Sequence, residues 1–142
     1  MKKILILFFA VMMLSLSACG IKKSSTPAGV RCDIDISTYS TTMAYSQVND
    51  FNQNPKNYGG KIIKMTGTFD VETANGRNYY SCNIKDSGAC CSAKLVFVLK
   101  DDLKYPDDYP KIGDTITVMG KFETYIENGK MLCQLKNASF CK

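Results

Sequence analysis

Cysteine is the residue type that gives this chain most of its possible chemistry. The 142-residue sequence has seven cysteines and no histidine. The lack of histidine excludes Ser–His and Cys–His nucleophilic pairs and any imidazole metal ligand. Three kinds of thiol chemistry remain, namely structural disulfides, thiolate metal binding and redox exchange. The cysteines stand at positions Cys19, Cys32, Cys82, Cys90, Cys91, Cys133 and Cys141.

Cys19 stands apart because it follows an export signal. Lys2 and Lys3 precede an apolar run at 4–14, and small and polar residues follow it. This layout predicts a signal peptide at 1–18, since the run is short for a bilayer crossing. An uncleaved membrane anchor is the alternative. The letters LSAC at 16–19 resemble the bacterial lipobox, which implies cleavage before Cys19 and diacylglycerol on its thiol. We therefore expect a cell-envelope protein that is lipid-anchored on the extracytoplasmic side of a bacterial membrane.

Residues 19–31 are polar, show no apolar period and predict a flexible lipidated tether. Residues 32–142 are long enough for one domain with its own core. The formal net charge is +5, and without Lys2 and Lys3 it is +3, from 16 basic and 13 acidic residues. This small excess is spread along the chain, so it does not indicate a polyanionic partner.

Six cysteines remain for this domain, and an even number in a small exported domain favours structural disulfides. Cys32 and Cys141 lie at the two ends of the domain. A bridge between them closes the longest loop, and on the chain-entropy account it stabilises the fold most. We therefore expect a Cys32–Cys141 bridge.

The other four domain cysteines leave three interpretations open. Cys82 and Cys133 are in phase with apolar neighbours, and Cys90 and Cys91 are expected on opposite faces of a strand, so bridges from the first two to the adjacent pair are feasible. The same four thiols are the set for a zinc or copper(I) site. Redox exchange is the third possibility. The spacing C-x7-C-C is not the C-x2-C of zinc knuckles or thioredoxins, so disulfides are favoured, with no metal or cofactor expected.

The elements that must position these residues begin with a short helix at about 42–54. Ala44, Val48 and Phe51 share one face of it. Thr41 or Thr42 is suited to cap its start, and the proline at 55 bars its continuation.

Five strands follow; the third is an apolar run, and the other four have apolar residues in phase on one face. Asn75-Gly76 and Asn128-Gly129 predict tight hairpin turns. The stretch 101–113 is rich in Asp, Tyr and Pro, which predicts a solvated acidic surface loop rather than a calcium site or paired catalytic carboxylates. The expected strands are 61–72, 77–85, 94–100, 114–127 and 130–136.

Two glycines suggest how these strands close on themselves. Gly67 and Gly120 lie on the apolar sides of the first and fourth strands, where a missing side chain permits a sharp bend. The pattern predicts a mainly β fold, a small five-stranded oligonucleotide/oligosaccharide-binding-like (OB-like) barrel at about 60–138, preceded by the short helix.

Four segments, YGGKIIKMTGTF, SCNIKDSGACC, YPKIGDTITVMGKFE and CQLKNA, resemble a group of uncharacterised bacterial lipoproteins with an OB-like domain. The resemblance covers about 58–138. It implies fold and location, and the group brings no established activity with it. The chain departs from the wider OB pattern because no helix is expected between the third and fourth strands.

An OB barrel presents ligands on the outer face of its second and third strands. We expect a non-enzymatic binding module whose ligand is a protein, peptide or glycan. Nucleic acid is not expected, because only one aromatic residue is placed for base stacking. The alternative function is a thiol-dependent metal-binding or redox protein of the envelope using the four cysteines above. The candidate ligand-face residues are Tyr79, Ser81, Asn83, Lys94 and Val96.

Overall fold

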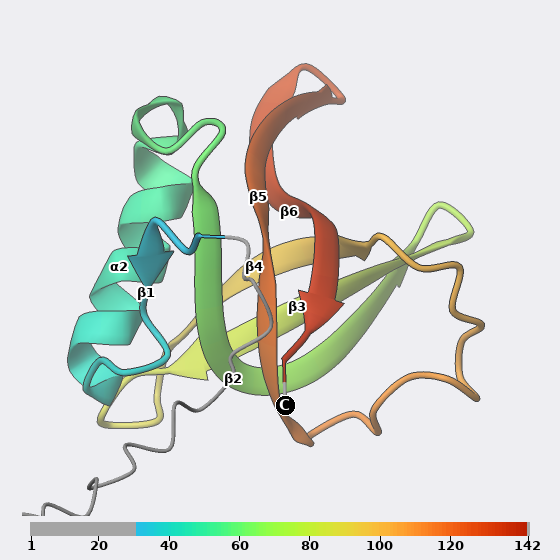
Figure 1. Cartoon of the computed structure of the whole chain (residues 1–142), viewed down its shortest axis with the longest axis horizontal. Helices are drawn as coiled ribbons and strands as arrows, with labels where there is room; N and C mark the ends of the chain where they lie inside the picture. The colour runs from blue at the N-terminus through green and yellow to red at the C-terminus, as the bar shows by residue number, and fades with distance from the viewer. Residues whose placement is uncertain (1–30, 142) are drawn as a thin grey trace, which may run out of the picture.

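The computed structural model describes residues 31–141, and these residues form a mainly β fold with one α-helix (Figure 1). The predicted mainly β class is confirmed, and the helix expected at about 42–54 is present as α2. In chain order the elements are β1 (Ile34–Asp35), α2 (Thr41–Gln53), the 3-10 helix η1 (Pro55–Asn57), β2 (Ile62–Ala74), β3 (Arg77–Lys85), β4 (Ser92–Leu99), β5 (Thr115–Glu127) and β6 (Lys130–Phe140).

The sheet closes on itself through β2, whose two halves have different partners. The strand order is β1-β2-β3-β4-β6-β5, and β2 also pairs with β5. The first half of β2 pairs with β5 from Ile62↔Lys121, and its second half pairs with β3 as far as Ala74↔Arg77. The β4–β6 pair is parallel and the other ring pairs are antiparallel. All five predicted strands thus lie in one hydrogen-bonded ring.

The predicted bend glycines lie where strands come very close together. An added Cβ at Gly67 would lie 2.6 Å from the backbone oxygen of Asn83, at the point where β2 changes partner. At Gly120 it would lie 3.0 Å from the Cβ atoms of Leu135 and Ala138, beside a register shift of the β5–β6 pair. Because a real Cβ does not fit at the first distance, glycine is what permits the sharp course of β2.

The core fills the ring and continues into α2. Four phenylalanines have 1% exposure or less. The ring centroids of Phe51 in the helix and Phe122 in β5 are 5.6 Å apart. Figure 1 shows α2 standing at one side of the ring, beside β1 and β2. Ser40 caps the helix by accepting a hydrogen bond from Met43 N at 3.4 Å. The predicted caps Thr41 and Thr42 are wrong, since both lie inside the helix.

The segments that leave the ring have the predicted character. Asn75 and Asn128 have φ values of 53° and 51°, as two-residue hairpin turns require. Residues 101–113 form a surface loop of turns and bends. Tyr109 holds this loop against the ring by stacking on Tyr80, with 4.3 Å between the ring centroids.

The strand β1 was not predicted, and it pairs in parallel with β2 outside the ring. Within residues 31–141, no helix is long and apolar enough to cross a membrane.

Candidate functional site

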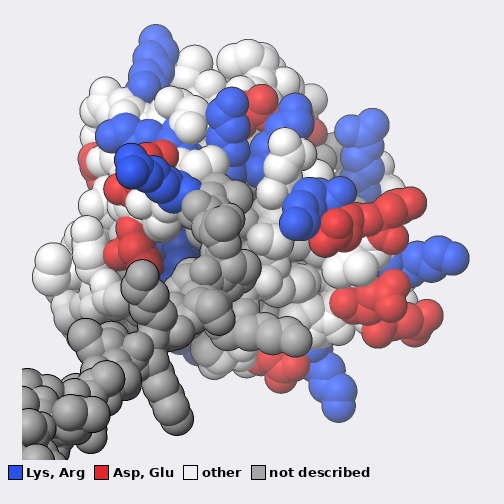
Figure 2. Space-filling model, in the orientation of Figure 1, with Lys and Arg blue, Asp and Glu red and all other residues white. Residues whose placement is uncertain are grey.

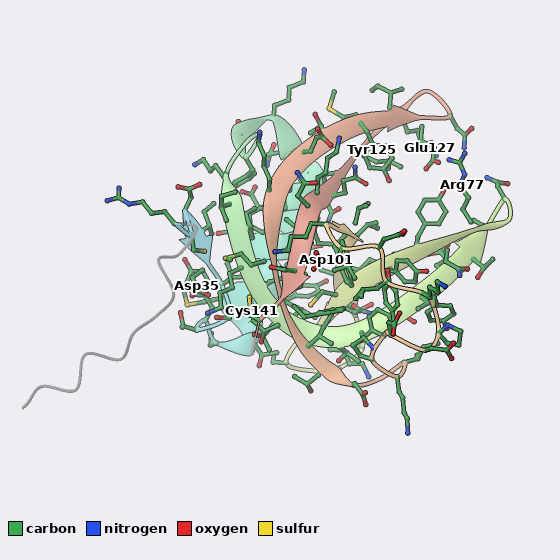
Figure 3. All side chains as sticks on the ribbon, turned by 45° about the vertical axis from the view of Figure 1, so that its right-hand side comes forward. Asp35, Arg77, Asp101, Tyr125, Glu127 and Cys141 are labelled. Carbon is green, nitrogen blue, oxygen red and sulfur yellow. The ribbon has the colours of Figure 1, made fainter. Side chains whose placement is uncertain are left out.

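A concavity lies over β3 and β4, between two hairpins. It consists of a cavity of about 520 Å³ and a neighbouring one of about 320 Å³, which we call together the hairpin groove. The β2–β3 hairpin contributes Arg77 and the β5–β6 hairpin contributes Tyr125 and Glu127, which face each other across the opening (Figure 3). Both cavities share the residues Tyr79, Val96, Tyr125 and Glu127.

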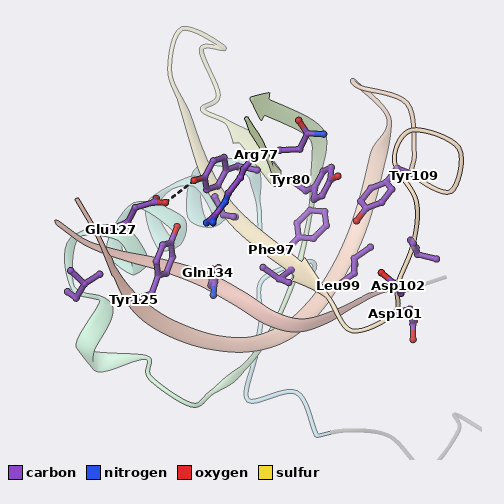
Figure 4. A pocket seen from close by; sticks show the side chains of 16 residues that line it. Arg77, Tyr80, Phe97, Leu99, Asp101, Asp102, Tyr109, Tyr125, Glu127 and Gln134 are labelled. Atoms are coloured by element: carbon purple, nitrogen blue, oxygen red, sulfur yellow. Dashed lines mark hydrogen bonds between the residues drawn. The ribbon is translucent and has the colours of Figure 1, made fainter. Parts of the chain in front are cut away.

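A hydrogen bond joins the two sides of the groove. Tyr79 Oη on β3 donates to Glu127 Oε1 at the end of β5 over 2.8 Å, the dashed contact in Figure 4. This bond raises the pKa of Tyr79, because the neighbouring carboxylate favours the protonated phenol. Burial raises the pKa of Tyr125, and the charge of Glu127 adds to the effect. Both phenols therefore keep their protons at neutral pH and act as hydrogen-bond donors.

Exposed apolar side chains gather along the groove. Val98, Ile126 and Leu132 line it and are 47%, 66% and 37% exposed. Isolated exposed apolar residues need no explanation, but several of them around one concavity are typical of a binding surface. The groove therefore offers apolar contact area beside the hydroxyl groups of its tyrosines.

The charged groups of the groove are mostly acidic. Four carboxylates stand against two cations, Arg77 and Lys94, and Lys94 forms an ion pair with Glu72. On the face shown in Figure 2, residues of both signs are interspersed. The groove thus lacks the cationic lining that a phosphate backbone requires. The carboxylates are those of Glu72, Asp101, Asp102 and Glu127.

Three of the five predicted ligand-face residues line the groove, namely Tyr79, Lys94 and Val96. The other two, Ser81 and Asn83, line neither cavity. Ser81 is only 3% exposed, and Asn83 Oδ1 is buried without a hydrogen-bond partner.

The helix α2 packs beside Asn83 and Lys94 on this face. The α2 residue Asn52 donates to the carbonyl oxygen of Lys94 at 3.2 Å, and Lys94 is paired with Asn83 in the sheet. The helix therefore lies against the part of β3 and β4 that alternation alone had assigned to solvent.

Sequence reasoning missed the groove residues on the two hairpins. Arg77 follows the Asn75-Gly76 turn, and Tyr125, Ile126 and Glu127 precede the second turn. The available signal was strand length. The strand β5 pairs with β2 only as far as Lys121 and then continues to Glu127 paired with β6 alone. The residues at the end of this hairpin therefore project beside the outer face of β3 and β4 and line the groove with it.

Two of the predicted site cysteines are core residues. Cys82 is fully buried, and Cys133 is 7% exposed, with its Sγ 3.7 Å from the carbonyl oxygen of Phe51. Burial raises the pKa of Cys82 to about 12 and that of Cys133 to about 11. Both thiols are consequently protonated and poorly reactive in the folded state.

The structure does not bring the buried thiols to the adjacent pair. Cys82 is paired with Leu95, and Cys133 lies at the same level, since Gln134 pairs with Val96. Cys91 is four residues away from Leu95 along the chain, which amounts to about 13 Å in a strand. A disulfide needs Cα atoms within about 7 Å, so the expected bridges to Cys90 and Cys91 do not fit this fold. For the same reason the four thiols do not form one metal site.

Cys32 and Cys141 are also held apart. Cys32 Sγ lies 3.7 Å from the carbonyl oxygen of Ile62 in β2, whereas Cys141 N donates to the carbonyl oxygen of Thr117 in β5 at 2.8 Å. Ile62 is paired with Lys121 of β5, which is four residues from Thr117. The two cysteines are therefore attached to positions about 13 Å apart along the strands. The arrangement of this fold therefore does not bring the two domain ends together for the expected bridge, and the structure has no disulfide within residues 31–141.

Cys90 and Cys91 lie in the β3–β4 turn, and the expectation that they face opposite sides of a strand is wrong. Their sulfur atoms are 3.5 Å apart, and both thiols are exposed. With Asp86 they form the one group of three potential metal ligands among the described residues. The predicted lipidation site Cys19 lies outside those residues.

Comparison with known proteins gives one structural likeness. No protein-family model and no curated protein matches the chain. A crystal structure from Klebsiella pneumoniae, described as a "putative nucleic acid-binding lipoprotein", superimposes with a TM-score of 0.44 and 16% identity. The match covers 76% of this chain and 91% of that one. A likeness at this level is too low to establish a shared fold or function.

Proposed function

We propose that residues 32–142 form an OB-like domain that binds its ligand in the hairpin groove and has no catalytic activity. The observation that carries this proposal is the position of the groove. OB domains bind over their second and third strands, between the loops that join strands one–two and four–five. In the ring of this protein these strands are β3 and β4, and these loops are the β2–β3 and β5–β6 hairpins.

The groove fits a peptide, a glycan or a segment of a partner protein. Its tyrosines and exposed aliphatic side chains suit ligands that have both apolar faces and hydrogen-bonding groups. Its carboxylates outnumber its cations, and one of the two cations is already paired. A polyanion is therefore disfavoured, and nucleic acid is not part of the proposal.

We further propose that the protein is held at the membrane by a lipid on Cys19. The support is the signal-like segment at 1–18 and the lipobox-like residues before Cys19. The polar stretch to residue 31 then separates the domain from the bilayer. The groove is thereby exposed to ligands on the extracytoplasmic side.

Site-specific photo-crosslinking in intact cells tests the groove. A photoreactive amino acid at Val98 is expected to capture a ligand, since that side chain is 47% exposed inside the groove. Met43 on α2 is the matched control, because it is 58% exposed and lies outside both cavities. Replacing Tyr79 and Tyr125 by alanine is expected to abolish capture at Val98 while the far-ultraviolet circular dichroism stays unchanged.

Two results would contradict the proposal. One is equal capture of the same molecule at Val98 and at Met43, which would show contact without a specific groove. The other is capture at Val98 that persists when both tyrosines are alanine.

A further inference from the structure

The turn between β3 and β4 gathers three potential metal ligands. Cys90 Sγ lies 3.5 Å from Cys91 Sγ and 3.2 Å from Asp86 Oδ2, and the ligand atoms of all three residues lie within 4.8 Å of one another. None of them lines the hairpin groove. Figure 1 shows this turn beside the lower part of α2, away from the β5–β6 hairpin. It is therefore a separate feature of the molecule.

The backbone of the turn explains why adjacent cysteines face the same way. Asp86 N donates to Cys91 O at 2.9 Å, and Ala89 N donates to Asp86 O at 3.0 Å, which closes residues 86–91 into a compact loop. Ala89 has a φ of 54°, in the left-handed region, so the chain reverses just before the two thiols. The pair precedes β4, and the alternation of a strand does not apply to it.

The spacing of the ligand atoms suits a tetrahedral ion of intermediate softness. Two thiolates on one tetrahedral Zn²⁺ at about 2.3 Å lie about 3.8 Å apart, close to the separation in this turn. Thiolates disfavour Mg²⁺ and Ca²⁺, which prefer oxygen ligands. We propose that Asp86, Cys90 and Cys91 bind one Zn²⁺ ion, with its fourth coordination position open to water.

Charge supports the same assignment. The Cys90 thiol donates a hydrogen bond to Asp86 Oδ2 at 3.2 Å, so a potential thiolate ligand and a carboxylate ligand are already in contact. A divalent ion removes the repulsion among three anionic ligands. Each thiol loses one proton when it binds zinc, so two protons are released and none of the groups is oxidised. Zinc binding is therefore expected to become tighter as the pH rises.

Zinc titration of the full-length protein, purified in detergent and fully reduced without oxygen, tests the site. We expect one equivalent of Zn²⁺ in competition with a chromophoric chelator, and Co²⁺ used as a probe should show the absorption of a tetrahedral thiolate site. Zn²⁺ should also protect Cys90 and Cys91 of the unaltered protein from alkylation, a measurement that needs no variant.

Matched variants identify the ligands. Cys90→Ser and Cys91→Ser should each weaken binding by at least about 100-fold, and Asp86→Asn by at least about tenfold, since even loss of an outer-shell partner costs that much. Cys141→Ser is the control, because this partly exposed thiol is absent from the cluster and should leave affinity unchanged.

Three results would overturn the proposal. The first is full zinc binding by a protein that carries both Cys90→Ser and Cys91→Ser. The second is a reduced, correctly folded protein that binds no zinc more tightly than about 100 μM, a free energy of only about 5 kcal/mol. The third is a Cys90–Cys91 disulfide in the isolated protein whose reduction restores two thiols that zinc does not protect.

Discussion

Gly67 offers the most direct test of how the ring closes. In Gly67→Ala the new Cβ would lie 2.6 Å from the backbone oxygen of Asn83 and 2.9 Å from Cys82 Sγ. Carbon atoms of real side chains do not approach a backbone oxygen that closely, so β2 and β3 must move apart. Overpacking of this kind costs about 1–3 kcal/mol. The alanine also restricts the unfolded chain, which returns about 0.4–1 kcal/mol. We expect a net loss of about 1–2 kcal/mol in the free energy of unfolding.

Gly59→Ala is the matched control. Its added Cβ would be 4.0 Å from the nearest atom, and its backbone is not in the left-handed region. It should therefore stabilise the protein by about 0.4–1 kcal/mol through the unfolded chain alone. Melting temperatures measured by circular dichroism should differ between Gly67→Ala and Gly59→Ala by about 8 °C, at about 4 °C per kcal/mol. If the two variants melt together, the close approach at Gly67 does not constrain the ring and the reasoning fails.

Three further expectations concern the anchor, the buried thiols and the ligand. Cys19→Ala should stop incorporation of radiolabelled palmitate, and normal maturation and membrane association of this variant would exclude the lipid anchor. Burial raises the pKa of Cys82 to about 12, so the thiol binds a proton in the folded state that the unfolded chain releases near pH 9. Its stabilising effect is complete below pH 9 and is lost as pH rises towards 12, by at most about 1.4 kcal/mol per pH unit. The urea midpoints of unfolding at pH 8 and pH 10 should differ less in Cys82→Ala than in the unaltered protein. An equal difference in both proteins would refute the raised pKa of Cys82. Fluorescence anisotropy with single-stranded DNA at 0.15 M salt should show no binding tighter than about 100 μM, and tighter, salt-dependent binding would reverse our view of the groove.

Elements whose two faces differ could be predicted from the sequence. The helix was readable because Ala44, Val48 and Phe51 share one face and all three are buried. The two Asn-Gly turns were readable because few other residue pairs adopt the required left-handed conformations. In both cases the signal is local, so neighbouring residues were enough.

Features that depend on packing between distant segments could not be predicted. The two residues of β1 are too short to show a period. Ser81 alternates like an outward residue, yet it is only 3% exposed in the folded domain. The disulfide hypotheses depend on register, and the pairing of Cys82 with Leu95 cannot be derived from cysteine spacing. The prediction that Cys90 and Cys91 face opposite sides of a strand is wrong because these residues lie in a turn, where strand alternation does not apply.

The small strand β1 is the first part of the sheet that a pulling force on the N-terminal end of the domain would meet. It enters the sheet through few contacts, among them the bonds Asp33 N–Ile62 O at 2.8 Å and Ile36 N–Lys64 O at 2.9 Å. The ring closes through β2 and β5 without it. A load applied to the N-terminal end of the domain therefore reaches β1 before it reaches the ring. In chain order β1 and α2 thus stand between that end and β2, the first strand of the ring.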